Sequence, residues 1–321
     1  MRIYVLVLDG VFDTGLATVL DAFETSNELA EMSGLTSPPF DVTIVGVRRA
    51  VNTSLGLIVP VAAIPKRVVP DWVVVPAIGF KMPGPLQAAL GRSDVSDAAK
   101  TLRSWAERGA YTAAACIGTF VLAESGLLDN QGSTTTWWLS PLFRQRYPKV
   151  RLDESRMIVK SGKFVTAGAA LSHMDLALWI IRQKSPRLAA LTARYLVVDA
   201  RPSQSAYILA DHLAHSDPLV ERFERWARGR ITRGFSLEDA AAAVGSSKRT
   251  LARRMQAVLG KSPLSYFQDL RVERAVHLLK TTAESVEEIA ARVGYADGAT
   301  LRTLLRRHLG HGIKEIRRSA G

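Results

Sequence analysis

The sequence contains one cysteine, Cys116, among its 321 residues. A single thiol excludes a disulfide within the chain, which fits a reducing cytoplasm and argues against a disulfide-stapled secreted protein. Long apolar runs are missing too, since none approaches the roughly 18 residues that a membrane-spanning helix needs. The N-terminus, MRIYVLVLDGVFDTG, is interrupted by Asp9, Gly10 and Asp13 and lacks the layout of a signal peptide. These absences predict a soluble, cytoplasmic protein without a membrane partner.

Histidine is scarce where a cysteine enzyme would need it. Only His173 lies within the first 200 residues. The other five are His212, His215, His277, His308 and His311. A nucleophilic cysteine needs a base within hydrogen-bond reach, but Cys116 is followed by Ile117 and not by His. His173 stands at the start of a predicted helix, where a solvated or capping role is the simpler interpretation. The shortage of bases argues against a cysteine hydrolase.

The charge of the chain is distributed unevenly. A chain of 321 residues with 47% hydrophobic residues is long enough for two domains with real cores. Its net charge is +12, and residues 222–321 contribute +10 of it, with 20 Lys and Arg against 10 Asp and Glu. The preceding 221 residues hold 22 basic and 20 acidic residues. A small, strongly basic module is typical of nucleic-acid binding.

This basic module contains an internal repeat. Residues 240–263 and 288–313 resemble each other, and each copy predicts a helix, a tight turn, a second helix and a glycine stop. The matched pairs are Gly245 with Gly294, Leu251 with Leu301, Met255 with Leu305 and Gly260 with Gly310. The pattern is that of two helix-turn-helix units. A solvated basic helical domain is the alternative, but the repeat, the charge and the turn glycines together favour DNA binding.

Helical phase separates a buried stripe from an exposed face in the second helix of each copy. The stripes are Leu251, Met255, Val258 and Leu259 in the first copy and Leu301, Leu304, Leu305 and Leu309 in the second. The predicted DNA contacts on the opposite faces are Lys248, Arg249, Arg253 and Gln256, then Arg302, Thr303 and Arg306. Arginine pairs with guanine and glutamine with adenine in the major groove, although each Arg could instead contact phosphate. Ser246 or Ser247 is expected to cap the first helix and Asp297 the second.

A third helix is predicted between the two copies, from Pro263 to Lys280. Proline suits the first turn of a helix. About 17 residues would span roughly 25 Å, a length that suits a spacer between two units reading successive turns of DNA.

Together these segments resemble the AraC-type DNA-binding domain. The resemblance rests on SKRTLARRM at 247–255, GKSPLSYFQDLRVERAVHLL at 260–279 and EEIAARVGYAD at 287–297. It implies that the partner is double-stranded DNA. The sequence departs from the family near its end, where Ile313 and Ile316 occupy places usually held by proline and an aromatic residue.

Strands alternate with helices in the first 200 residues. Strands are predicted at 2–8, 41–47, 71–76, 110–115, 156–160 and 164–166, with a hairpin piece at 57–61 and a loop at 77–85. Helices are predicted at 14–32, 94–108, 117–125, 171–181, 186–198 and 218–227. The alternation indicates an α/β fold with a doubly wound, mainly parallel sheet. We therefore expect an α/β domain at 1–200, a linker at 201–221 and an all-α DNA-binding domain at 222–321.

Cys116 stands at a predicted strand-to-helix turn, after the small residues 113–115. Such an elbow is expected to expose the side chain above the sheet, and the following helix N-terminus should lower the pKa of the thiol. The residues leave four roles open, namely a nucleophile, a redox-sensitive thiol, one wall of a ligand pocket and a buried small hydrophobe. Asp13 follows the first strand and could approach Cys116 across the strand ends, or act as a turn or cap residue.

The first 200 residues resemble the ThiJ/PfpI-like superfamily, which is related to the glutamine amidotransferases. The resemblance rests on the segments 113–138, LDGVFDTG at 8–15 and VTAGAALSHMDLALWII at 165–181. Similar proteins have TTHW after the elbow, and Thr136 here replaces the expected His, which implies sensing rather than catalysis. Asp13 matches the acidic position that faces the cysteine in the superfamily.

The combined layout resembles the GlxA-like transcriptional regulators. It implies a homodimer that binds promoter DNA, contacts RNA polymerase and responds to a small-molecule effector. The effector pocket is expected around Cys116, Asp13, Ile117 and Thr136. We expect no enzymatic activity, cofactor or metal. Two alternatives stay open, a cysteine amidase or deglycase-like enzyme with a DNA-targeting module and a redox switch at Cys116.

Overall fold

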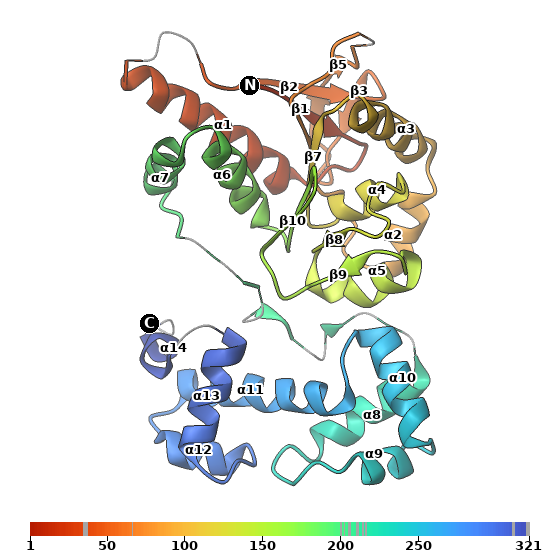
Figure 1. The fold of residues 1–321 in the computed structure, drawn as a ribbon, viewed down its shortest axis with the longest axis vertical. Coiled ribbons are helices and arrows are strands. Elements are labelled where there is room, and N and C mark those ends of the chain that lie inside the picture. The colour runs from red at the N-terminus through yellow and green to blue at the C-terminus, as the bar shows by residue number, and fades with distance from the viewer. Residues whose placement is uncertain are drawn as a thin grey trace. The chain divides into compact units, whose positions relative to one another are not determined.

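The computed structural model describes residues 1–34, 38–65, 67–199, 201, 203–204, 207–209, 212–213, 215, 217–309 and 312–318 (Figure 1). The chain forms two compact units, Met1–Gln204 and Ser205–Gly321. We call them the α/β unit and the helical unit and describe each by itself. Within the described residues, none of the helices combines the length and apolar character that spanning a bilayer requires.

A seven-stranded sheet forms the centre of the α/β unit. Its order is β10-β11-β7-β6-β1-β2-β5, and all neighbours are parallel except the β10–β11 pair. The strands are β1 (Arg2–Val7), β2 (Asp41–Gly46), β5 (Ala62–Ala63), β6 (Trp72–Val75), β7 (Tyr111–Ala115), β10 (Ile158–Ser161) and β11 (Phe164–Ala167). The continuous apolar run of β1 is buried because helices cover both faces of the sheet. The predicted doubly wound, mainly parallel fold is confirmed.

Helices α1, α6 and α7 lie on one face of the sheet and α2, α3 and α4 on the other (Figure 1). Their bounds are α1 (Asp13–Met32), α2 (Pro83–Leu90), α3 (Ser93–Glu107), α4 (Gly118–Glu124), α6 (Ser172–Lys184) and α7 (Pro186–Tyr195). The apolar faces of α1, α6 and α7 join the strands in one core that includes Ile3, Phe23 and Ile180. Burial of this continuous apolar surface is the main force that holds the unit together.

The sequence missed the short elements of this unit. Segment 77–85 was predicted as a loop, but α2 begins at Pro83 within it. The predicted hairpin piece at 57–61 is confirmed as β4 (Ile58–Pro60), which pairs with β3 (Ala50–Asn52). The elements without a prediction are β3, β5, β8 (Gly132–Ser133), β9 (Arg151–Leu152), η1 (Trp137–Leu139) and α5 (Ser140–Arg146). These pieces are too short for a periodic signal, so tertiary pairing determines them.

The helical unit carries the repeat as two helix-turn-helix units. Its helices are α8 (Pro218–Arg228), α9 (Leu237–Ala243), α10 (Lys248–Leu259), α11 (Pro263–Thr281), α12 (Val286–Arg292), α13 (Gly298–Leu309) and α14 (Ile313–Arg318). The first unit is α9–α10 and the second is α12–α13. Gly245 and Gly294 close the two turns with positive φ angles of 68° and 82°, a conformation that favours glycine. Gly260 ends α10 in the left-handed conformation, while its predicted counterpart Gly310 lies outside the described residues.

Side chains cap the starts of three helices of this unit, and the caps predicted at Ser247 and Asp297 are confirmed. Asp217 accepts hydrogen bonds from the backbone at the start of α8, and Ser247 caps α10 through the N–H of Thr250 at 3.1 Å. Asp297 accepts from Thr300 at 2.7 Å at the start of α13. Each bond satisfies an N–H that the first helical turn leaves free. The boundaries of these helices therefore follow local side-chain chemistry, which the sequence reveals.

Candidate DNA-contacting helices and the Cys116 site

Helix α10 separates its buried and exposed residues as predicted. Leu251, Met255 and Leu259 are buried against the rest of the helical unit. The four candidate contacts, Lys248, Arg249, Arg253 and Gln256, are all exposed. The helix therefore presents three cations and one amide to solvent on the face away from its core, an arrangement that suits insertion into a major groove.

Helix α13 repeats this arrangement. Leu301 and Leu305 are buried in a core shared with α11, α12 and α14, and Ile316 of α14 completes that core where the family usually has an aromatic residue. The candidates Arg302, Thr303 and Arg306 are exposed. Thr303 donates its hydroxyl proton to the carbonyl of Ala299 at 3.0 Å, which leaves its oxygen able to accept a hydrogen bond.

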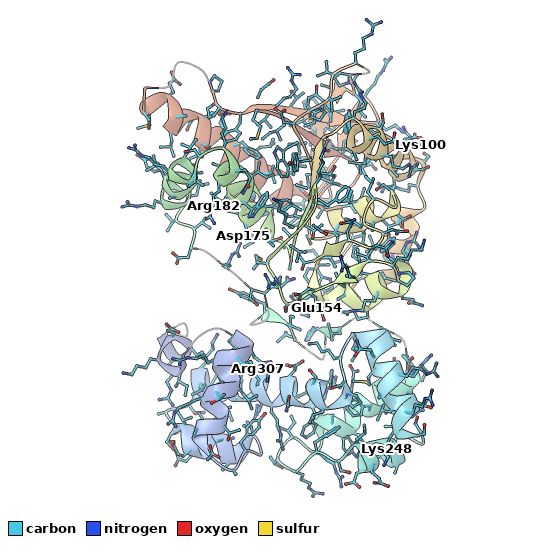
Figure 2. All side chains as sticks on the ribbon, in the orientation of Figure 1. Lys100, Glu154, Asp175, Arg182, Lys248 and Arg307 are labelled. Carbon is cyan, nitrogen blue, oxygen red and sulfur yellow. The ribbon has the colours of Figure 1, made fainter. Side chains whose placement is uncertain are left out.

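The five candidate cations of the two helices fall into two groups. Lys248 lies 3.5 Å from Glu238 and Arg302 lies 2.8 Å from Glu287, and the two glutamates occupy equivalent first-turn places in α9 and α12. By contrast, the described residues provide no ion pair for three other cations, namely Arg249, Arg253 and Arg306. Figure 2 shows Lys248 on α10 and Arg307 on α13 among the many basic side chains of this unit. The three cations without an ion pair can contact DNA without breaking one first.

Helix α11 joins the two helix-turn-helix units through the buried Arg271, which the sequence reading missed. Its guanidinium group donates to the carbonyls of Ile231 and Arg233, between α8 and α9. It also lies between the rings of Phe267 and Tyr295, 4.8 and 5.0 Å from their centroids. Because Tyr295 belongs to the turn of the second unit, one side chain ties both units to α11.

Asp269, two residues earlier on α11, makes a second connection. Its carboxylate lies 2.8 Å from the ammonium group of Lys261, just after α10, and 3.3 Å from the ring of His308 on α13. Burial alone would raise the pKa of Asp269, but the bonds from His308 and Lys261 outweigh it and lower the pKa. The sequence did contain a signal for these two residues, since Asp269 and Arg271 are opposite charges two positions apart on the predicted spacer helix.

Cys116 forms the predicted elbow but does not expose its thiol. Its backbone has a positive φ of 54°, which is strained for a residue other than glycine. The side chain is only 3% exposed, so the prediction of an exposed thiol was wrong. Burial raises its pKa to about 12, outweighing the opposing contacts of the Ile117 backbone and the Thr136 hydroxyl. The predicted lowering of the pKa was therefore also wrong, because desolvation exceeds the effect of the helix N-terminus.

His173 is a buried structural residue and not a solvated or capping one, as the sequence had suggested. Its Nε2 accepts from the N–H of Ala77 at 3.1 Å, and its Nδ1 donates to the carbonyl of Ala170. Burial lowers the pKa of His173 to about 4, so the ring is neutral at physiological pH. Both ring nitrogens are occupied by backbone groups, so the ring is not placed as a base for Cys116.

The predicted pocket residues divide into two groups. Ile117 and Thr136 are buried beside the thiol. Asp13 instead accepts hydrogen bonds from the Ser54 hydroxyl at 2.7 Å and the Leu55 N–H at 3.1 Å. Burial opposes the ionisation of Asp13, but bonds from Thr53 and Ser54 lower its pKa overall. Its described contacts are those of a loop anchor, the turn role that the sequence also allowed.

Further buried hydroxyl groups lie near Cys116 in the fold. Thr119 follows it by three residues on α4, and Ser172 follows Ala170, whose backbone contacts the thiol. The hydroxyl oxygens of Thr119 and Ser172 have no hydrogen-bond partner among the described residues. Buried polar atoms normally have partners, so this region has unused hydrogen-bonding capacity. No group of three His, Cys, Asp or Glu residues suited to a metal ion occurs in the described part of the chain.

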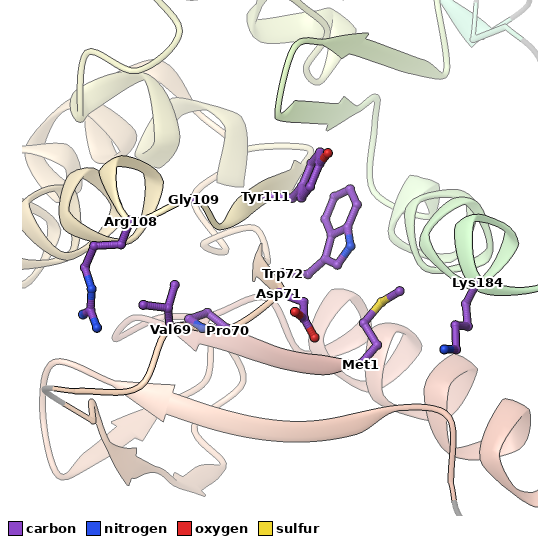
Figure 3. Close-up of a pocket in the computed structure, with 9 residues that line it drawn as sticks. All are labelled: Met1, Val69, Pro70, Asp71, Trp72, Arg108, Gly109, Tyr111 and Lys184. Carbon is purple, nitrogen blue, oxygen red and sulfur yellow. The ribbon is translucent and has the colours of Figure 1, made fainter.

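A pocket of about 620 Å³ lies elsewhere in the α/β unit, at the amino ends of its strands (Figure 3). Trp72 and Tyr111 stack in it at the starts of β6 and β7, with a ring-centroid distance of 4.8 Å. Arg108 and Lys184 lie on either side of the two rings (Figure 3). Because Cys116 follows the carboxyl end of β7, this pocket belongs to the opposite edge of the sheet and contains none of the predicted site residues.

Comparison with known proteins agrees with this architecture. Residues 1–183 match the family model described as DJ-1/PfpI family, and residues 240–319 match one described as a helix-turn-helix domain. The HTH-type transcriptional regulator GbdR of Pseudomonas aeruginosa is 27% identical over 60% of this chain and 54% of its own length. The chain thus spans about half the length of this curated relative.

Two further proteins that match this chain also carry the names of transcriptional regulators. The HTH-type transcriptional regulator GlxA of Rhizobium meliloti is 24% identical over 71% of this chain and 72% of its own length. An AraC family transcriptional regulator from Pseudomonas putida has a crystal structure that superposes with a TM-score of 0.50 at 19% identity, over 61% of this chain and 98% of its own. At this identity the structure supports the fold alone. With more than half of its residues matched by one family model, the chain belongs to the DJ-1/PfpI family and carries an AraC-type helix-turn-helix domain after that unit.

Proposed function

We propose that this protein is a transcriptional regulator that binds promoter DNA through α10 and α13. The observation that carries the proposal is the pair of exposed basic helix faces joined through Arg271 and Asp269 on one spacer helix. Two recognition helices tied to one spacer can enter successive major grooves, where the Arg and Gln side chains contact bases and phosphates. The names of the relatives GbdR and GlxA support the same function.

The finer parts of the proposal concern location and assembly. We infer a cytoplasmic homodimer that contacts RNA polymerase at the promoter. The hairpin of β3 and β4 exposes three large apolar side chains, Leu55, Leu57 and Ile58. An apolar surface of this kind favours protein association, so we assign the α/β unit to dimerisation.

We further propose that the Cys116 region senses a small effector and does not catalyse a reaction. The unpartnered hydroxyl groups of Thr119 and Ser172 provide hydrogen-bonding capacity for a polar ligand. A thiol with a pKa of about 12 and a histidine occupied by backbone groups are poorly suited to nucleophilic catalysis at neutral pH. Turnover of an amide or glyoxal-type substrate that disappears in Cys116→Ser would contradict this assignment.

Fluorescence anisotropy tests the DNA-binding proposal. The full-length protein would be titrated onto a labelled duplex from upstream of its own gene, and onto a scrambled duplex, at several salt concentrations. We expect tighter binding to the native duplex than to the scrambled one. The logarithm of the association constant should fall linearly with the logarithm of the salt concentration, because phosphate contacts release counterions. Replacing Arg249, Arg253 and Arg306 together by Ala should abolish the preference for the native duplex. It should also make the salt dependence of binding shallower, by the contribution of up to about three phosphate contacts.

The matched control is Arg182→Ala, which removes an exposed arginine from α6 of the α/β unit (Figure 2). This variant changes the net charge without touching α10 or α13, so it should bind like the wild type. Equal binding of the wild type to both duplexes, or an unchanged preference in the triple variant, would refute the proposed role of the two helices.

A further inference from the structure

The last residues of the α/β unit form a clasp on its surface, although the sequence reading placed them in a linker. We use this name for Arg201, Ser203 and Gln204. Arg201 forms an ion pair with Asp175 of α6, which is labelled in Figure 2. Ser203 donates its hydroxyl proton to the carbonyl of Ser155 at 2.7 Å. These two side-chain contacts hold the chain at the point where it leaves this unit, and Gln204 adds further ones.

Gln204 makes the most complete contacts of the clasp. Its side chain is buried, with the residue only 1% exposed. Its Oε1 accepts from the N–H of Ala169 at 2.9 Å, and its Nε2 donates to the carbonyl of Thr135 at 3.0 Å and the hydroxyl of Thr134 at 3.2 Å. Both ends of the carboxamide are therefore matched. A buried glutamine with its bonds satisfied in this way marks a specific receiving site.

The receiving site is shaped for this side chain. A Cβ atom on Gly168 would lie 2.5 Å from Gln204 Oε1, so only glycine leaves room for the carboxamide. The backbone N–H of Gln204 donates to the carbonyl of Ser155 at 2.9 Å. Glu154, the residue before Ser155, forms an ion pair with Arg144. The turn that receives the clasp is therefore anchored to α5.

The same segments form the walls of the Cys116 site. The Thr135 hydroxyl donates to the carbonyl of Cys116 at 2.7 Å while the Thr135 carbonyl accepts from Gln204. Thr136 and Ala170 contact the thiol, and each directly follows a residue that Gln204 holds. Gln204 and the thiol thus contact neighbouring residues of the same two short segments, 134–136 and 169–170.

From these contacts we propose that Gln204 is a positioning residue that couples the Cys116 site to the DNA-binding unit. A ligand that displaces either wall segment must strain or break the bonds of the carboxamide, and release of Gln204 frees the chain where the helical unit begins. A ligand acts on DNA binding only through a difference in affinity between two states, and the held and released clasp supply such states. This coupling rests on the proposed function as a DNA-binding regulator.

The thiol of Cys116 provides a direct test, because it is the only cysteine in the sequence. The rate of alkylation by N-ethylmaleimide would be measured in full-length wild type, Gln204→Ala and Gln87→Ala. Gln87 is an exposed glutamine on α2 of the same unit and serves as the matched control. We expect at least a tenfold faster alkylation in Gln204→Ala and the wild-type rate in Gln87→Ala. A wild-type rate in Gln204→Ala, with its circular dichroism unchanged, would overturn the proposal.

Chemical rescue separates positioning from a general loss of stability. Acetamide can fill the vacated site in Gln204→Ala, because the substitution removes the Cγ methylene and the carboxamide, and it should restore slow alkylation because it can both donate and accept. Acetate should not, because a carboxylate cannot donate to the carbonyl of Thr135. If Gln204→Ala does not fold, Gly168→Ala offers a second route, since the added methyl group should displace an intact Gln204 and accelerate alkylation. Equal rescue by both compounds, or an unchanged rate in folded Gly168→Ala, would count against the receiving site.

The coupling itself is read from DNA affinity. Alkylation of Cys116 should change the dissociation constant of the wild type for its duplex at least threefold, and should leave that of Gln204→Ala unchanged. An equal change in both proteins would refute the coupling through Gln204. A wild type that binds no DNA would instead refute the proposed function, while the alkylation rates would still decide whether Gln204 positions the Cys116 site.

Discussion

The two units of this protein place their polar groups in opposite ways. Around Cys116, the α/β unit buries a thiol, an imidazole and several hydroxyl groups, and burial decides their protonation. The helical unit buries Arg271 and half-buries Asp269 but keeps the candidate cations of α10 and α13 exposed. An exposed charged side chain keeps the protonation state that is usual for its residue type. The protonation of a buried group depends instead on desolvation and on its neighbours. The comparison explains why local patterns predicted the exposure of the candidate cations on α10 and α13 but not the burial of Cys116.

The largest expected effect concerns the reactivity of Cys116. With a pKa of about 12 instead of the ordinary 9.0, its thiolate fraction between pH 7 and 9 should be roughly a thousandfold below that of a free thiol. The folded protein should react with N-ethylmaleimide correspondingly slowly. Its rate should still rise tenfold per pH unit above pH 9, where that of a free thiol levels off. Alkylation rates from pH 7 to 10 would measure this.

Urea-unfolded protein is the control for this measurement, because it exposes the same thiol without burial. It should react at the rate of a free cysteine. A folded-state rate within tenfold of that value at pH 8 would mean that the helix N-terminus governs the thiol after all. The claim that burial controls the protonation of groups in the α/β unit would then be wrong for Cys116.

His173 should make the α/β unit sensitive to mild acid. Its pKa is about 4 when folded and about 6.5 when unfolded, so between these values the unfolded chain binds the extra proton. The stabilisation is complete above pH 6.5 and is lost as the pH falls, by roughly 3 kcal/mol at pH 4. Urea unfolding followed by tryptophan fluorescence would report it, since five of the six tryptophans lie in this unit.

His173→Gln provides the comparison. A glutamine does not titrate, so the variant should be less stable at pH 7 but should lose less stability between pH 6.5 and 4. Parallel pH profiles for both proteins would show that another group causes the acid sensitivity.

How much the sequence could predict follows from the same distinction. The repeat, the amphipathic phases and the caps of the helical unit are local patterns, and Gly245, Gly294 and Asp297 take the conformations or contacts that these patterns indicate. The parallel sheet was equally accessible, because β1 and β6 are continuous apolar runs. The burial of Cys116 depends on residues 20 to 54 positions away, such as Thr136 and Ala170. No local pattern reports such contacts, and the same holds for Gln204, whose partners lie 35 to 70 positions away.

Arg253→Ala should weaken specific DNA binding by about 1–3 kcal/mol if the side chain forks to a guanine. Arg253 is exposed, and the described residues provide it with no ion pair. The neighbouring Arg254 is paired with Asp217, which makes Arg254→Ala a matched comparison with a smaller expected effect on binding. Anisotropy on the native and scrambled duplexes would separate the roles of Arg253. Equal weakening on both duplexes would make it a phosphate contact.

The smallest effect tests whether local chemistry alone sets the start of α10. The sequence left Ser246 and Ser247 as alternative caps, and in the structure only the Ser247 hydroxyl accepts from the helix, at the N–H of Thr250. The Ser246 hydroxyl instead donates to the Ser247 carbonyl at 3.3 Å, outside the helix. Ser247→Ala should therefore lower the free energy of unfolding of the helical unit by about 1 kcal/mol, and Ser246→Ala by much less. Thermal unfolding followed at the single tryptophan of that unit, Trp226, would measure both. Equal losses would mean that the turn, and not one hydroxyl group, determines where the helix begins.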